Sequence, residues 1–144
     1  MQVQECMTKN PATIRAESSL QKAAENMGIH DFGALPVSKD NKLVGMVTDR
    51  DICVRGTAKG FRPDEPVTKV MTEELLYCRA SDDVEDVLNN MGAMQVRRLP
   101  VVDEQKQLVG IVSIGDLVKA RPSEGGKCFA EVAQPSNLHS QTIP

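Results

Sequence analysis

The chain has 144 residues, a length typical of one compact domain. Its 17 Lys and Arg against 20 Asp and Glu give a net charge of −3, which excludes the strong positive field that nucleic-acid binding needs. The first ten residues lack the apolar core of a signal peptide, and no stretch reaches the roughly 20 apolar residues of a membrane span, so we expect a cytoplasmic protein without a membrane partner.

Residues 1–58 predict an extended piece, a helix, a hairpin and a second helix, in that order. The extended piece covers 12–15, and Ser18, with a glutamine three positions later, is the expected N-cap of the first helix. Next, LPVSKDNKLVGMV predicts two short strands joined by a charged turn, and a helix over 49–55 follows. The segment 59–66, which contains Gly and Pro, is expected to be a linker.

The same order recurs over residues 67–121, which makes the chain an internal duplication. An extended piece over 76–79 precedes a helix that Asp82 is expected to cap, and LPVVDEQKQLVGIV predicts the second hairpin. A helix over 114–119 ends the copy. The matching pairs include Met7 and Met71, Leu35 and Leu99, Pro36 and Pro100, Gly45 and Gly110, Val47 and Val112, and Asp51 and Asp116.

The fold class that follows is α/β (α+β), with two tandem β-α-β-β-α repeats. A single unit of about 60 residues buries too little surface to be stable alone. We therefore expect the repeats to pack through their sheets about a pseudo-two-fold axis. Residues 122–144 are rich in Ser, Gln, Gly and Pro and lack a periodic apolar face, so they are expected to form a loose tail that the fold does not need.

Side chains that carry enzyme chemistry are sparse in this sequence. The four cysteines stand singly with no CxxC pair, and the two histidines match no triad or metal-ligand spacing. Neither GxxxxGK[ST] nor GxGxxG occurs. We expect no enzymatic activity, no catalytic residue, no metal site and no required cofactor.

The strongest candidates for a binding site lie where each hairpin passes into its second helix. Thr48 and Asp51 follow Gly45, and Ser113 and Asp116 stand at the same spacing after Gly110. A hydroxyl and a carboxylate three residues apart form an ordinary capping box. The same groups suit a nucleotide, because a helix N-terminus attracts phosphate and a carboxylate accepts hydrogen bonds from ribose hydroxyls.

The duplicated pattern LPV…LVG-h-V-[T/S]-x-x-D, which follows a capped helix in both copies, resembles a tandem pair of CBS domains, a Bateman module of the stand-alone type. The resemblance covers about residues 1–121. It implies a regulatory module that binds adenosine-type ligands (AMP, ADP, ATP, S-adenosylmethionine or NAD) in two clefts between the repeats. The family's ribose-binding carboxylate falls on Asp51 and Asp116, and its hydroxyl falls on Thr48 and Ser113.

The resemblance also implies where phosphate and base would lie. The family's phosphate contacts fall just before each LPV strand, on Gly33 and Ala34 in the first copy and on Arg97 and Arg98 in the second. The base contacts fall on the early extended segment of the opposite repeat, around Ala12 and Leu76. Only the second copy has guanidinium donors, so the site with Asp116 is expected to bind phosphate more tightly.

Two function classes therefore remain for the chain. The first is the ligand-binding module, which would signal through an unidentified protein target or through a homodimer formed by the second helices near Ile52 and Leu117. The alternative is a structural module for dimerisation or partner docking, with clefts that bind nothing.

Overall fold

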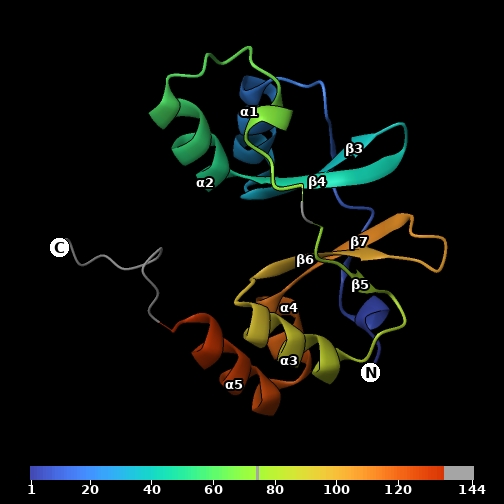
Figure 1. The fold of residues 1–144 in the computed structure, drawn as a ribbon. Coiled ribbons are helices and arrows are strands. Elements are labelled where there is room, and N and C mark those ends of the chain that lie inside the picture. The colour runs from blue at the N-terminus through green and yellow to red at the C-terminus, as the bar shows by residue number, and fades with distance from the viewer. Residues whose placement is uncertain (74, 135–144) are drawn as a thin grey trace. The chain divides into compact units, whose positions relative to one another are not determined.

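The computed structural model describes residues 1–73 and 75–134 (Figure 1). These residues form two compact units, which do not coincide with the two halves of the chain. The N-repeat unit is Asn10–Leu76, and the C-repeat unit combines Met1–Lys9 with Tyr77 and the residues after it. None of the helices in the described residues has the length and apolar character that crossing a membrane requires.

The N-repeat unit is a three-stranded sheet with helices. Strand β2 pairs in parallel with β3, which pairs antiparallel with β4. Its core is formed by aliphatic side chains from both the sheet and α1, and Val67 and Val70 contribute to it. The elements are β2 (Ile14–Arg15), α1 (Leu20–His30), β3 (Ala34–Lys39), β4 (Lys42–Thr48), α2 (Asp49–Asp51), a π-helical turn (Ile52–Gly56) and 3-10 turns at Thr57–Lys59 and Val67–Lys69.

The C-repeat unit repeats this plan with a four-stranded sheet in the order β1-β7-β6-β5. Its core is formed by side chains of α3, α4 and the sheet, and Val3 and Cys128 contribute from outside the repeat's hairpin. The elements are a 3-10 turn (Val3–Glu5), β1 (Thr8–Lys9), β5 (Cys78–Arg79), α3 (Val84–Met94), β6 (Arg98–Val102), β7 (Leu108–Ser113), α4 (Ile114–Ala120) and α5 (Pro122–Val132).

The segment that begins each sequence repeat packs on the hairpin of the other repeat. Thr8 in β1 pairs with Ile111 in β7, and Thr72 exchanges backbone hydrogen bonds with Met46 in β4. A glycine faces the exchanged segment in each case: a Cβ atom on Gly45 would lie 2.8 Å from the carbonyl oxygen of Thr72. The exchange explains why the compact units differ from the sequence repeats.

Both first-helix caps lie one residue later than the sequence indicated. Ser19, and not Ser18, caps α1 by accepting a hydrogen bond from the Lys22 amide at 3.0 Å. In the second copy Asp83 caps α3, whereas the Asp82 carboxylate accepts a hydrogen bond from the Arg79 amide in the preceding turn. In each copy two adjacent residues of the same type could cap the helix, and the second of them does so.

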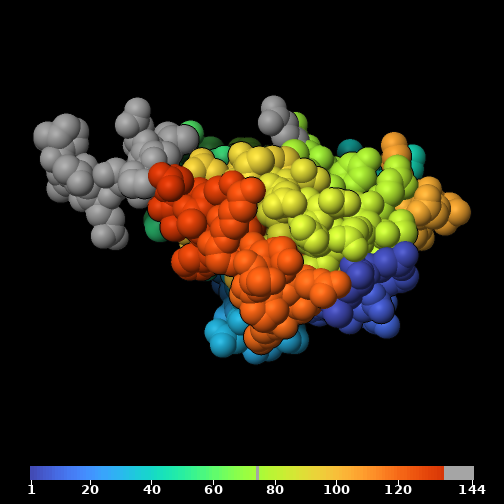
Figure 2. Space-filling view, turned by 90° about the horizontal axis from the view of Figure 1, so that it is seen from below, coloured from blue at the N-terminus to red at the C-terminus, as the bar shows by residue number. Residues whose placement is uncertain are grey.

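The expectation of a loose tail is wrong for residues 122–132, because they form α5. This helix lies alongside α3, as Figure 2 shows by the orange and red surface next to the yellow-green one. Gly125 and Cys128 are buried, and Cys128 belongs to the core of the unit. Residues 135–144, the remainder of the expected tail, lie outside the described residues.

The expected dimer requires Leu117 to lie at an exposed edge, but the structure buries it. Its side chain is 0% exposed and packs in the core of the C-repeat unit. The apolar positions of α4 serve the fold of their own unit, so Leu117 does not contribute to a surface for a second copy.

Candidate functional site

The first junction joins β4 to α2 and is closed by a reciprocal pair of hydrogen bonds. The Asp51 amide donates to Thr48 Oγ1 at 3.0 Å, and the Thr48 amide donates to Asp51 Oδ2 at 3.0 Å. The second carboxylate oxygen, Asp51 Oδ1, lies 3.8 Å from Arg55 Nε. Arg55 also donates to the Val70 carbonyl at 3.2 Å, so its guanidinium is held over the Asp51 carboxylate.

The second junction joins β7 to α4 with the same capping box but without the cation. The Ser113 amide donates to Asp116 Oδ2 at 2.9 Å, and the Asp116 amide donates to Ser113 Oγ at 3.1 Å. The residue four positions after Asp116 is Ala120, where the first copy has Arg55. Among the described residues no ion pair involves Asp116, so its Oδ1 is the less engaged of the two equivalent oxygens.

Strand register brings the residues before each LPV strand to the junction of the same repeat. Ala34 pairs with Thr48 across β3 and β4, and Arg98 pairs with Ser113 across β6 and β7. Both Arg97 and Arg98 are exposed. The carbonyls of the preceding residues accept hydrogen bonds from the first helical amides: Gly33 from Asp49 and Arg97 from Ile114, both at 3.0 Å.

The two positions expected to contact a base, Ala12 and Leu76, lie outside regular structure. Both are exposed, Leu76 at 45%, and each precedes the first strand of its repeat by two residues. Because β2 runs parallel to β3, with Ile14 opposite Val37, Ala12 lies towards the end of the sheet where Ala34 begins β3.

Sequence reasoning missed Asp49, the residue that follows the capping Thr48. Its Oδ1 accepts a hydrogen bond from the Arg50 amide at 2.8 Å, and its Oδ2 lies 2.9 Å from where a Cβ atom on Gly33 would be. The second copy has Ile114, which is buried, at this position. Because the two copies differ at this position, Asp49 is not among the residues that the duplication marks.

Sequence reasoning also missed Cys6, which the exchange of segments brings to the C-repeat unit. Burial is the main cause that raises the pKa of the Cys6 thiol, and the nearby carboxylates of Asp116 and Glu5 raise it further. Burial likewise raises the pKa of Cys78, to about 12. A thiol with a raised pKa is mostly protonated at neutral pH, so Cys6 adds no charge near Asp116, and its Sγ donates to the Val3 carbonyl at 3.5 Å.

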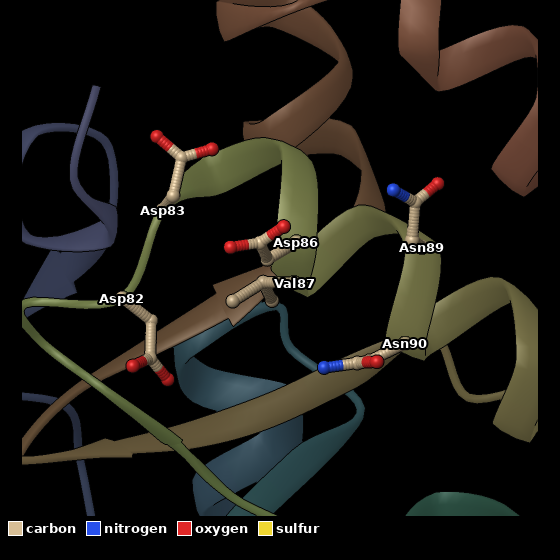
Figure 3. A pocket seen from close by; sticks show the side chains of 6 residues that line it. All are labelled: Asp82, Asp83, Asp86, Val87, Asn89 and Asn90. Atoms are coloured by element: carbon tan, nitrogen blue, oxygen red, sulfur yellow. The ribbon is translucent and has the colours of Figure 1, made fainter.

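An open pocket of about 410 Å³ lies elsewhere, at the start of α3 (Figure 3). Two of its acidic side chains accept hydrogen bonds from backbone amides of the chain itself. Asp82 accepts from the Arg79 amide at 2.8 Å, and Asp83 accepts from the Glu85 amide at 2.9 Å and pairs with the N-terminal amine at 3.4 Å. No group of three or more His, Cys, Asp or Glu side chains in the described part of the chain could hold a metal ion. The lining residues are Asp82, Asp83, Asp86, Val87, Asn89 and Asn90.

Comparison with known proteins accounts for the two equivalent junctions. The family model described as "CBS domain" matches residues 3–55 and again residues 67–123. The chain belongs to the CBS domain family. As a CBS pair it is 44% identical over 139 residues to the CBS domain-containing protein YhcV of Bacillus subtilis, covering 95% of this chain and 98% of YhcV.

Two solved CBS pairs with the same fold were crystallised with adenosine ligands. The crystal structure of CBSX2 in complex with AMP is 31% identical, with a TM-score of 0.74 and coverage of 83% of this chain and 94% of CBSX2. The CBS domain pair of MJ0100, in complex with 5′-methylthioadenosine and S-adenosyl-L-methionine, is 25% identical with a TM-score of 0.75, covering 86% of this chain and 98% of that one. These likenesses establish the tandem CBS fold of the chain.

Proposed function

We propose that this CBS pair is a regulatory module, without enzymatic activity or a required cofactor, that binds an adenosine-type ligand. The ligand class is AMP, ADP or ATP, with S-adenosylmethionine or NAD as further members. The observation that carries the proposal is the second junction, where Asp116, Ser113 and two exposed arginines lie together. The AMP complex of CBSX2 supports the same ligand class.

The chemistry of the second junction suits a nucleotide monophosphate or polyphosphate. Asp116 is held by the Ser113 amide through one oxygen, which leaves Oδ1 to accept a hydrogen bond from a ribose hydroxyl. Arg98, beside Ser113 in the sheet, and Arg97 supply guanidinium donors, which bind phosphate oxygens in pairs. In the first junction Asp51 faces Arg55, while Gly33 and Ala34 offer no side-chain donor.

A thermal-shift experiment with a panel of adenosine ligands tests the proposal. A ligand present at 100 times its dissociation constant stabilises the fold by about 2.7 kcal/mol, which raises the melting temperature measurably. We expect AMP, ADP or ATP to raise it, while a guanosine nucleotide at the same concentration serves as the control. An unchanged melting temperature with every adenosine ligand would contradict the proposal.

We further propose that the module acts as a homodimer and passes its signal to a separate protein. With Leu117 buried, the support for a dimer comes from the helical segment after Asp51, where Ile52 is half-buried and Val54 is 43% exposed. Light scattering should give about twice the chain mass of 15.7 kDa at micromolar concentration, and Val54→Asp should shift the mass towards that of one chain. A mass near that of one chain for the unmodified protein would contradict the dimer.

A docking module whose junctions bind nothing is the second candidate. The observation that favours it is the first junction, where the protein's own groups already accept the hydrogen bonds of three consecutive amides, those of Asp49, Arg50 and Asp51. The thermal-shift panel separates the two candidates, because a docking module would show no response to any small ligand.

A further inference from the structure

The two junctions differ most at the two positions between the capping hydroxyl and the carboxylate. The first junction has Asp49 and Arg50 there, and the second has Ile114 and Gly115. The Asp49 carboxylate lies over the start of the helix: one oxygen accepts from the Arg50 amide at 2.8 Å and the other faces Gly33. This is the place where, in the second copy, Arg97 precedes the LPV strand.

The backbone amides at the start of the two helices consequently differ in their hydrogen-bond acceptors. In the first junction the Arg50 amide donates to a carboxylate, which is the type of acceptor that a phosphate oxygen would be. In the second junction Gly115 has no side chain to play this part, and no hydrogen bond from its amide occurs within the described residues. The first junction therefore already contains an anion.

The charge of Asp49 is not neutralised by a neighbour. Arg50 is exposed, and no ion pair to Asp49 forms within residues 1–73 and 75–134. The guanidinium of Arg55 faces Asp51 instead. A phosphate at Gly33 would thus meet a fixed negative charge, whereas at Arg97 and Arg98 it would meet two positive ones.

We infer that Asp49 excludes phosphate from the first junction, which therefore selects adenosine ligands that carry no negative group at the 5′ position, such as a nucleoside, a thioether or a sulfonium. The inference rests on the proposed function and assigns a ligand class to one of its two sites. Asp51 and Thr48 remain the groups that would hold the ribose, and Asp49 is the specificity-determining residue.

Calorimetry on a protein whose second junction is disabled by Asp116→Ala tests this inference. That protein should bind adenosine at least as tightly as AMP. Adding Asp49→Asn keeps an oxygen to accept from the Arg50 amide but removes the charge, so AMP affinity should rise about ten-fold while adenosine affinity stays within about two-fold. Asp49→Ser, which also keeps an oxygen acceptor, should act alike if the asparagine variant folds poorly.

Asp40→Asn is the matched control, since it removes one negative charge at the β3–β4 turn, the opposite end of the hairpin from Thr48. It has a positive φ of 52°, which asparagine tolerates, and it should leave both affinities unchanged.

Each other outcome of the calorimetry has a definite meaning. A preference for AMP in the Asp116→Ala protein, an unchanged ratio of AMP to adenosine affinity after Asp49→Asn, or an equal effect of Asp40→Asn would overturn the inference. If the unmodified protein binds AMP but the Asp116→Ala protein binds neither compound, the inference fails and the proposed function stands. If the unmodified protein binds neither compound, both fail.

Discussion

At the scale of single residues, each junction carries a half-buried carboxylate that closes a capping box through one oxygen. One oxygen of Asp116 is fixed by the Ser113 amide, so the orientation of the other is set before any ligand arrives. The pairing of hydroxyl and carboxylate could be predicted from the sequence, because a capping box has a fixed spacing. The role of Asp49 could not, because the second copy has Ile114 at this position and the duplication marks only residues that both copies share.

The two capping carboxylates should contribute unequally to nucleotide binding. Asp116→Ala should abolish the tighter AMP event in calorimetry, and Arg98→Ala should weaken it about ten- to a hundred-fold, the loss of a charge-assisted hydrogen bond of about 1.5–3 kcal/mol. Asp51→Ala should leave that event intact.

Asp116→Asn is the matched control for loss of the cap, because its amide oxygen can still accept from Ser113. Asp116→Ala also loses the hydrogen bond of the cap, which costs about 1 kcal/mol in the free energy of unfolding, whereas Asp116→Asn keeps it. Comparing the two variants therefore separates the effect on AMP binding from the effect on stability. The assignment would be reversed if Asp51→Ala removed the tighter event and Asp116→Ala did not.

At the scale of elements, α5 shows how packing overrides local propensity. Two glycines and a serine within residues 122–132 disfavour a helix, so the sequence predicts a loose segment there. In the structure Gly125 lets α5 approach α4, since a Cβ atom there would lie 2.6 Å from Val118 Cγ2. The residue that weakens the isolated helix is thus the one that lets it dock.

Truncation after Arg121 should therefore destabilise the protein. It removes Cys128 from the core and uncovers apolar side chains of α3 and α4, with a loss of about 2–3 kcal/mol in the free energy of unfolding, comparable to exposing one large side chain. Phe129→Ala serves as the control: its side chain is 63% exposed, so a change within about 0.5 kcal/mol is expected. Urea denaturation measures both, and an unaltered midpoint after truncation would show that α5 contributes nothing to stability.

At the scale of the whole molecule, the duplicated sequence does not reveal that the first segment of each repeat packs on the hairpin of the other repeat. The sequence shows Met-Thr near the start of each repeat and predicts that a glycine lies in the second strand of each hairpin. Because both copies contain both features, Met7 could pack on either Gly45 or Gly110 without any change in the pattern. The structure selects the glycine of the other repeat, Gly110 for Met7 and Gly45 for Met71. The secondary structure of each repeat could be predicted, but the partner of its first segment could not.

Fragments of the chain should fold according to the compact units and not according to the repeats. A sequence repeat alone is too small to be stable, but residues 10–76 add Val67 and Val70, which complete the core of this unit, so the fragment 10–76 should unfold cooperatively on heating, as measured by circular dichroism. Residues 1–58 lack both valines and retain Val3 without its core, so they should show no cooperative transition. Cooperative unfolding of 1–58 alone would contradict the exchange.

Seen along the backbone, the N-repeat unit is an insertion. Its residues lie between Lys9 and Tyr77 in the sequence, and both of these flanking residues belong to the C-repeat unit. During synthesis the inserted unit is complete well before the ribosome has made β7, the strand on which β1 pairs. Residues 1–9 therefore wait for β7 while the 67 residues that follow them fold, so a segment that precedes the N-repeat unit in the sequence reaches its place after that unit.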